Sequence, residues 1–421
     1  MNPEKKGWLK DYLGHRKSLL KDYQTLKSKT AHPEQAIYRI IQPTGLMYGQ
    51  SVTELEYSGS DKWSEKDKMK FLLAESLIGS SILFYEKPIN SDADLNEIIS
   101  RTVVSIGSFY THVFPELGTS AKTWLGKKKE PIDLAEQILE KRVTKQVTSS
   151  GSFWVKFFNN SLLFLDVHIF GQWIHTKGDQ IISEFFKYQR EELRASVVKV
   201  ITSAAHANQT LEFEERKLFD FFLQSSGLSI EKKQEAREIF QSGLEIEGIE
   251  LSTNNSWILR KYFLEMAILT VWADKRIEET ELYFLKRLTK HIGFSRDELD
   301  NSMLALQGFV LQHWSKFDLL HEKKAFADLS DEFIARLLAI TESHKGRLIR
   351  EAKENYRLMR LIKKANSDEL SESEKGQIRE HILTTLRTLP NFSSLSLPQG
   401  FLNYTNVIKV LPKNFFAEAL A

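Results

Sequence analysis

The chain has 421 residues, of which 42% are hydrophobic and 27% are charged, and its formal net charge at pH 7 is +2. These are ordinary values for globular domains, and the length allows two or three of them. The absence of cysteine excludes a disulfide framework, a thiolate metal site, an iron–sulfur cluster and a cysteine nucleophile. With 9 prolines and 20 glycines the chain has too few turn signals for an all-β fold, so we predict an all-α, multi-helix array.

The N-terminal third is predicted to form helices joined by polar loops. Residues 1–30 carry eight Lys or Arg against three Asp or Glu and lack the apolar core of a signal peptide, so we expect a cytoplasmic protein. Residues 42–61 and 118–131 lack helical periodicity and are predicted to be exposed connections. Apolar spacing predicts helices over 6–28, 65–86, 92–113, 131–147, 153–174 and 179–204.

Two apolar segments are long enough to test as membrane spans. Lys156 and Asp166 interrupt residues 153–174, and each charge at bilayer depth costs about 2.5–3.5 kcal/mol. Residues 389–411 contain two prolines and many polar side chains, so they offer no continuous apolar helix of about 20 residues. We therefore expect 153–174 to be a buried central helix and 389–411 to pack in water.

A duplicated helical hairpin follows. Residues 205–229 and 271–295 align without a gap at an offset of 66 residues. Each copy reads as a helix, a polar turn and a second helix ended by a glycine, which is predicted to take the left-handed conformation of a C-terminal cap. The identical pairs are Ala207/Ala273, Glu212/Glu278, Glu215/Glu281, Gly227/Gly293 and Ser229/Ser295.

This duplication resembles the TerB-like domain, named for a tellurite-resistance protein, in which an Ala-Asp-Gly turn followed by a spaced glutamate occurs twice. The resemblance covers about residues 195–315, although Gln209 and Lys275 replace the glycine of the turn. It implies a stress-response role and an acidic site at Asn208, Glu215, Asp274 and Glu281. From the residues themselves, the carboxylates are too few for a hard cation, which takes about six to eight oxygen ligands, and cap helix ends instead. We predict no metal site.

A basic stripe marks the helix predicted over 344–365. Glu351 and Glu354 lie one turn from the first cations and are expected to neutralise part of the stripe. The acidic run from Asp368 to Glu374 can fold back on it. The stripe either binds an anionic partner, which is acidic lipid or a phosphate backbone, or is an ordinary solvated face. Its cations, spaced by three or four residues on one helix face, are Arg347, Arg350, Lys353, Arg357, Arg360 and Lys364. The adjacent apolar strip consists of Leu348, Ala352, Tyr356, Met359 and Ile362.

The C-terminal tail begins with a helix that Ser371 and Glu374 are predicted to open as a capping box. Leu-Pro pairs then recur at 389–390, 397–398 and 411–412. This cadence is similar to that of the LETM family, whose mitochondrial members are inner-membrane proteins involved in ion homeostasis and ribosome association. Together with the TerB-like middle, it resembles the bacterial LETM-related biofilm-associated proteins. That resemblance implies envelope or biofilm physiology and names no reaction.

No phosphate-binding loop, dinucleotide-binding fingerprint, zinc-protease motif or nucleophile elbow occurs, so we predict no enzyme, no catalytic residue and no cofactor. We divide the chain into an N-terminal helical domain (1–178), a TerB-like domain (179–320) and a C-terminal region (321–421) with the LETM-like segment at 376–421. The leading hypothesis, from the basic stripe, the tail and the resemblance, is a non-enzymatic interaction or scaffold protein that binds a protein partner or an anionic membrane surface. It would then be peripheral to the inner membrane on the cytoplasmic face. The alternatives are a ribosome- or RNA-associated factor and a metal-responsive stress protein.

Overall fold

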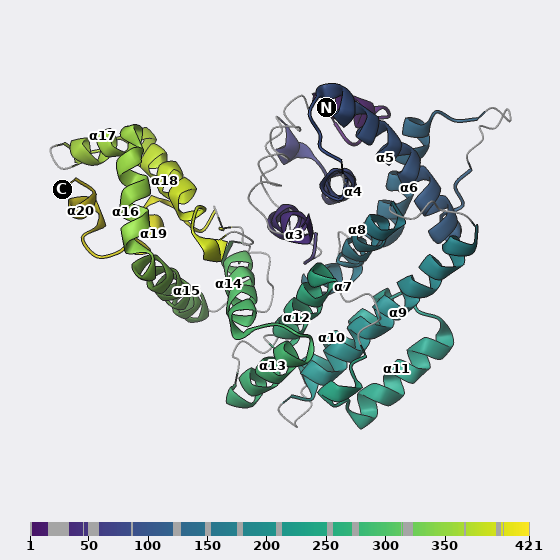
Figure 1. Ribbon diagram of the computed structural model, residues 1–421. Coiled ribbons are helices and arrows are strands. Elements are labelled where there is room, and N and C mark those ends of the chain that lie inside the picture. The colour runs from purple at the N-terminus through teal and green to yellow at the C-terminus, as the bar shows by residue number, and fades with distance from the viewer. Residues whose placement is uncertain are drawn as a thin grey trace. The chain divides into compact units, whose positions relative to one another are not determined.

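The residues that the computed structural model describes form helices joined by turns and loops (Figure 1). These are residues 2–15, 33–44, 46–48, 59–85, 87–120, 128–147, 153–174, 180–207, 213–250, 256–271, 278–312, 314, 323–365, 368–392, 397–398 and 400–420. Because no β-strand occurs within these ranges, the predicted all-α class is confirmed. The chain folds into two compact units, residues 1–296 and 297–421. The predicted three-part division at 178/179 and 320/321 remains a prediction.

Helix α4 (Glu65–Leu83) lies at the centre of the N-terminal half of unit 1 and is almost completely buried from Met69 onward. Serine N-caps fix where α4 and α5 begin, because Ser64 and Ser91 each accept a hydrogen bond from a backbone N–H three residues later. Four helices pack around α4: α3 (Pro33–Thr44), α5 (Asp92–Val113), α6 (Pro131–Gln146) and α8 (Leu162–Trp173). These bounds confirm the helices predicted over 65–86, 92–113 and 131–147.

The first predicted helix is present as α1 (Trp8–His15), which begins two residues later than predicted, and residues 16–28 lie outside the described residues. Helix α1 packs against α6, where Glu136 accepts hydrogen bonds from the N–H groups of Gly7 at 2.7 Å and Leu9 at 3.1 Å. A carboxylate at a helix N-terminus satisfies orphan donors and opposes the helix dipole. This contact packs the start of the chain against the rest of unit 1.

The single helix predicted over 153–174 is divided at Ser161 into α7 (Phe153–Asn160) and α8, so that prediction is wrong about continuity. The Asn159 carbonyl accepts a hydrogen bond from the Gln146 side chain at 2.6 Å, and the Phe164 N–H binds the Ser161 carbonyl three residues back. The regular helical ladder is therefore interrupted. Helix α8 is buried on nearly all sides, as predicted. Within the described ranges, we find no helix with the length and apolarity that crossing a bilayer requires.

The predicted duplication is confirmed by the positions of the helix ends between residues 180 and 312. Each copy consists of a long helix, a hairpin partner and a third helix: α9 (Gln180–Ala205), α10 (Phe213–Ser225) and α11 (Ile230–Ser242), then α12 (Trp257–Val271), α13 (Glu279–His291) and α14 (Arg296–Gln312). Helices α9 and α12 end 66 residues apart, α10 and α13 correspond at both ends, and α11 and α14 begin 66 residues apart. Gly227 and Gly293 take the predicted left-handed conformation, with φ of 64° and 75°. Helices α9 and α12 pack against each other.

Unit 2 contains α14 beyond its first residue and the helices of the C-terminal region. The latter are α15 (Lys323–Ser343), α16 (Lys345–Glu354), α17 (Tyr356–Ala365), α18 (Glu372–Leu386), α19 (Tyr404–Lys409) and α20 (Phe415–Leu420). The leucines of the three Leu-Pro pairs, Leu389, Leu397 and Leu411, are all buried in the core of this unit. The prediction that the proline-punctuated tail packs against helices is therefore confirmed for its described residues.

Candidate anion-binding surface

The helix predicted over 344–365 is two helices, α16 and α17, and the prediction of one continuous helix is wrong. Asn355 separates them with ψ of 87°, outside the helical range. Its N–H binds the Ala352 carbonyl at 3.0 Å at the end of α16, and its side-chain oxygen accepts from the Leu358 N–H at 3.1 Å at the start of α17. An asparagine side chain competes in this way with the helical backbone pattern. The signal for the break was therefore present in the sequence as an Asn at a cap position.

The cations of the predicted stripe are all exposed on these two helices. Arg347, Arg350 and Lys353 lie on α16, and Arg357, Arg360 and Lys364 lie on α17. Lys363 of α17 is exposed as well, and the predicted stripe omits it because it falls outside the spacing of three and four residues. Because Asn355 breaks the helix, the cations do not form one straight stripe. They form two groups on consecutive helices.

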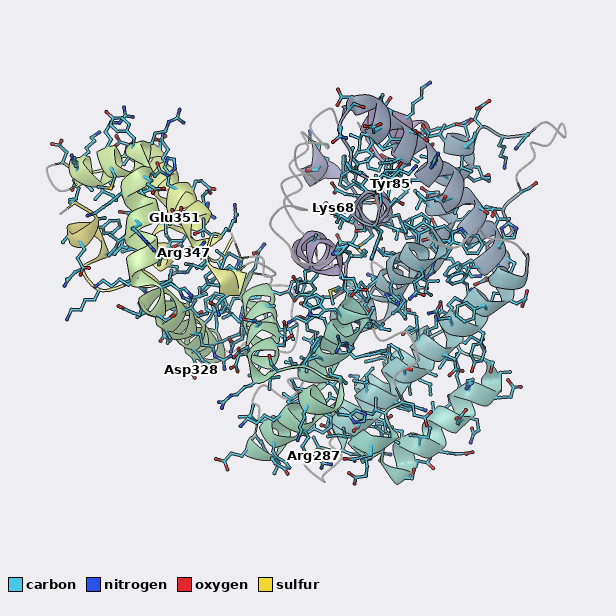
Figure 2. The ribbon with its side chains drawn as sticks, viewed as in Figure 1. Lys68, Tyr85, Arg287, Asp328, Arg347 and Glu351 are labelled. Atoms are coloured by element: carbon cyan, nitrogen blue, oxygen red, sulfur yellow. The ribbon has the colours of Figure 1, made fainter. Side chains whose placement is uncertain are left out.

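Six of these cations make no ion pair in the part of the chain that the structure describes. Residues 345–365 contain eight Lys or Arg against two Glu, which gives a local charge of +6. The sequence predicts that Glu351 and Glu354 neutralise Arg347 and Arg350, but no ion pair joins them; Figure 2 labels Arg347 and Glu351 on α16. The basic surface is defined here as the unpaired set Arg347, Arg350, Lys353, Arg357, Arg360 and Lys363.

Lys364 differs from the other stripe cations because it is paired. Its ammonium group lies 2.6 Å from Glu374 at the start of α18. This hydrogen bond, together with those from Ser371, lowers the pKa of Glu374 to about 2. Ser371 and Glu374 also form the predicted capping box. The expectation that the acidic run folds back on the stripe therefore holds for Glu374, which contacts the last cation.

The apolar side of the two helices is turned into the unit 2 core. Leu348 and Ala352 of α16 are buried there, as are Leu358, Leu361 and Ile362 of α17. Tyr356, a member of the predicted apolar strip, is instead 78% exposed. The break at Asn355 changes the register of α17 relative to α16, and this change brings Leu358 and Leu361 inward in place of Tyr356. An aromatic side chain therefore lies among the cations.

The acidic residues of the TerB-like resemblance are only partly described. Asn208 and Asp274 lie outside the described residues. Glu215 and Glu281 are 4% and 1% exposed, and Glu281 accepts a hydrogen bond from the Glu278 N–H at 2.7 Å within the capping box of α13. The Glu281 carboxylate thus caps its own helix, whereas the sequence led us to expect the cap from Asp274 and to place Glu281 against a neighbouring helix end. Among the residues with defined positions, no group of three or more His, Asp or Glu side chains could hold a metal ion.

Comparison with known proteins gives partial similarities. No family model matches the chain, and no solved structure matches it. The chain is 25% identical over 123 residues to the co-chaperone protein DjlA of Vibrio cholerae, which covers 27% of this chain and 43% of that protein. It is 25% identical over 138 residues to DjlA of Vibrio parahaemolyticus, covering 31% and 49%, and 29% identical over 112 residues to DjlA of Aliivibrio fischeri, covering 25% and 40%. The chain therefore spans less than half the length of the curated relatives it matches.

Proposed function

We propose that this chain is a non-enzymatic interaction protein that binds an anionic membrane surface through the basic surface of α16 and α17. The observation that carries the proposal is the set of six exposed cations without ion-pair partners among the described residues. On a solvated helix face, a carboxylate one turn from a cation can pair with it and offset its charge. Here Glu351 and Glu354 are present and form no such pairs.

The partial similarity to co-chaperones supports the interaction role. The name co-chaperone denotes a protein that works together with other proteins, so the similarity favours a protein that acts through contacts. The LETM-related resemblance, read from the Leu-Pro cadence, supports the cytoplasmic face of the inner membrane as the setting and envelope or biofilm physiology as the context. A protein partner at that surface is compatible with both similarities.

Attraction to lipid by this surface is expected to be electrostatic. The apolar faces of α16 and α17 are buried in the unit 2 core and are not free to enter lipid. Each basic residue close to an anionic leaflet contributes about 1 kcal/mol, so six give an upper value of about 6 kcal/mol. This attraction acts within a Debye length of about 8–10 Å and weakens as salt is added. Tyr356, exposed among the cations, suits the headgroup region, where tyrosine is enriched.

A ribosome- or RNA-associated role is the second candidate, because the same cations can contact phosphates and Tyr356 can stack on a base. Single-stranded nucleic acid is bound by series of aromatic side chains. Tyr356 is the one aromatic residue between 345 and 365, so we favour the membrane. A metal-responsive role would depend on Asn208, Glu215, Asp274 and Glu281, of which the buried Glu281 already caps α13.

The experiment compares binding of the full chain to neutral phosphatidylcholine vesicles, to vesicles that also contain phosphatidylglycerol, and to polyuridylate. We expect binding to the anionic vesicles that falls with salt and is lost in the Arg357→Gln, Arg360→Gln, Lys363→Gln triple variant. The matched control is Lys5→Gln, Lys6→Gln, Lys10→Gln, which removes the same charge from exposed positions of unit 1. Equal binding to both vesicle types, or equal losses in both variants, would refute the membrane proposal. Binding to polyuridylate alone would support the RNA candidate.

A further inference from the structure

A groove of about 420 Å³ runs between α9 and α11, which pack side by side in unit 1 (Figure 1). Its walls include the apolar side chains Ala195 and Val198 of α9 and Ala236 and Ile239 of α11, together with Leu228 just before α11. Three exposed apolar side chains lie on the same two helices. They are Phe185 and Tyr188 of α9, which are 56% and 65% exposed, and Ile230 of α11, which is 83% exposed.

Charged side chains complete the walls of the groove, and they are not all paired. Lys232 lies 3.3 Å from Glu192 and 3.8 Å from Glu235, so its single positive charge offsets one of these two negative charges. Lys199 is half-buried in the wall and makes no hydrogen bond or ion pair with any residue of known position. Glu250 is exposed and is likewise without an ion-pair partner among the described residues. A half-buried ammonium group without an acceptor is a position where a bound carboxylate would gain a charge-assisted hydrogen bond.

The internal duplication shows what such a helix face can receive. The positions on α12 that correspond to Ala195 and Lys199 of α9 are Lys261 and Glu265, each 66 residues later. Both are 1% exposed. They are covered by α3 and the segment after it, because the hydroxyls of Tyr38 and Tyr48 donate to the Glu265 carboxylate at 2.5 and 2.6 Å.

The electrostatics of the covered copy are complementary. The Lys261 ammonium lies 5.6 Å from the centre of the Tyr38 ring, in the range of a cation–π contact. Burial and the neighbouring Glu265 raise the pKa of Tyr38 above its ordinary value, so this hydroxyl remains a donor. In the second copy, then, an amphipathic helix from the same chain covers the face and presents donors to its acceptor. In the first copy, the corresponding face is a groove with a lysine in place of the acceptor.

We propose that the groove between α9 and α11 receives an amphipathic helix of a partner protein, whose apolar face carries one Asp or Glu that pairs with Lys199. In the covered copy, Glu265 is an acceptor and its partners are hydroxyl donors. Lys199 lies at the equivalent position and is a donor, so its expected partner is an acceptor. Glu192 and Glu235 are both engaged by Lys232, and the third acidic wall residue, Glu250, is exposed to solvent, which screens its repulsion of this carboxylate. The site lies in unit 1, and the inference does not rest on the membrane-binding role proposed for the basic surface of unit 2.

The test uses a synthetic probe based on the sequence of α3. A hydrocarbon-stapled peptide with the sequence of residues 33–44 is made with Glu, Gln or Lys in place of Tyr38, and its affinity for the full chain is measured by fluorescence anisotropy. We expect the Glu peptide to bind at least about tenfold more tightly than the Lys peptide, with the Gln peptide between them. Methyl NMR shifts at Leu228 and Ile239 are expected to report the occupied groove.

Charge-swap variants of the protein make the test specific. Lys199→Glu is expected to reverse the order of the Glu and Lys peptides, and Lys199→Gln, which adds no new charge, to remove the preference. Lys286→Glu is the matched control, because Lys286 is an exposed lysine of α13 outside the groove. Absence of binding by all three peptides, a preference that Lys199→Glu leaves unchanged, or a preference that the control variant also reverses would overturn the proposal.

Discussion

The guanidinium of Arg194 occupies the place next to Gly227 where a side chain would begin, since Nη1 would lie 2.7 Å from a β-carbon added to that glycine. The same relationship recurs 66 residues later between Arg260 and Gly293, at 3.0 Å. Arg260 Nη1 donates to the carbonyls of Ile292 at 3.1 Å and Gly293 at 3.3 Å, and Arg194 Nη1 reaches the Gly227 carbonyl at 3.5 Å. In each copy, an arginine of the first helix thus lies at the C-terminal end of the second helix, where a cation is favourable.

The two copies are predicted to respond differently to the same substitution. Gly227→Ala and Gly293→Ala both place a β-carbon in a left-handed backbone, which costs roughly 1–2 kcal/mol. Arg194 is 6% exposed and cannot move aside freely, whereas Arg260 is partly exposed and can. We therefore expect Gly227→Ala to lower the free energy of unfolding by about 3 kcal/mol and Gly293→Ala by about 1–2 kcal/mol in urea titrations.

Gly346→Ala is the matched control for both glycine variants. It lies within α16, and a β-carbon there would meet no atom within 4 Å. A glycine-to-alanine change inside a helix stabilises it by up to about 1 kcal/mol, so this variant is expected to unfold at the same or a higher urea concentration. Equal losses for Gly227→Ala and Gly293→Ala would contradict the role assigned to Arg194.

A buried ion pair explains why the central helix α8 tolerates an aspartate. Asp166 accepts hydrogen bonds from Arg142 Nε at 2.6 Å and Nη2 at 3.0 Å, and from the Tyr110 hydroxyl at 2.9 Å. Asp166→Asn leaves the Arg142 cation buried without its carboxylate, so we expect a loss of about 3–5 kcal/mol in the free energy of unfolding. Tyr110→Phe removes a single hydrogen bond and is expected to cost about 1–2 kcal/mol.

The exposed pair between Arg101 and Glu97 provides the comparison for this buried network. Glu97→Gln removes a carboxylate of the same charge from a solvent-exposed pair on α5, and such pairs contribute little to stability. No measurable change is expected for this variant in the same urea titration. If Asp166→Asn were as stable as Glu97→Gln, the buried pair would not stabilise the packing of α5, α6 and α8.

Local signals in the sequence are sufficient for most of the helices, and they are not sufficient for long-range pairings. Serine caps, Pro131 and the two left-handed glycines act within one turn of the chain, so they can be read directly. The repeat is visible because Glu215 and Gly227 recur at a fixed offset. The pairing of Tyr38 with Glu265 spans 227 residues and carries no local signature.

The basic surface shows how a single cap changes a prediction about a site. All six predicted cations are exposed, since periodicity places charged residues correctly on either side of the break. Their predicted arrangement is wrong because a continuous helix requires Asn355 to be helical, whereas its side chain caps α17. The pairing of Lys364 with Glu374 agrees with the predicted folding back of an acidic run, but which carboxylate makes the contact depends on where α18 begins.

His168 is predicted to make stability depend on pH. Burial in α8 lowers its pKa from 6.5 to about 4. Between these values the His168 side chain binds a proton in the unfolded chain but not in the folded chain. The contribution of His168 to the free energy of unfolding is therefore greatest above pH 6.5 and falls as the pH drops toward 4. The loss amounts to at most about 3 kcal/mol. Urea titrations of His168→Gln between about pH 4 and 7 are expected to show a free energy of unfolding that changes less with pH than that of the unaltered protein. An equal dependence on pH in both proteins would contradict the assignment to His168.

The basic surface that we propose as a binding site is predicted to reduce the stability of the folded chain. Its six cations repel one another, and none is offset by an ion pair with a described residue. Replacing all six by Gln removes that repulsion without removing buried contacts, so thermal unfolding of the full chain is expected at the same or a higher temperature. The difference should shrink as salt is added, because salt screens exposed charges. Lys364→Gln is the opposite case on the same helix, since it removes the partner of Glu374 and is expected to lower the unfolding temperature slightly. If the variant with all six cations replaced unfolded at a markedly lower temperature than the unaltered chain, these cations would stabilise unit 2. The reason to regard them as a partner-binding surface would then be lost.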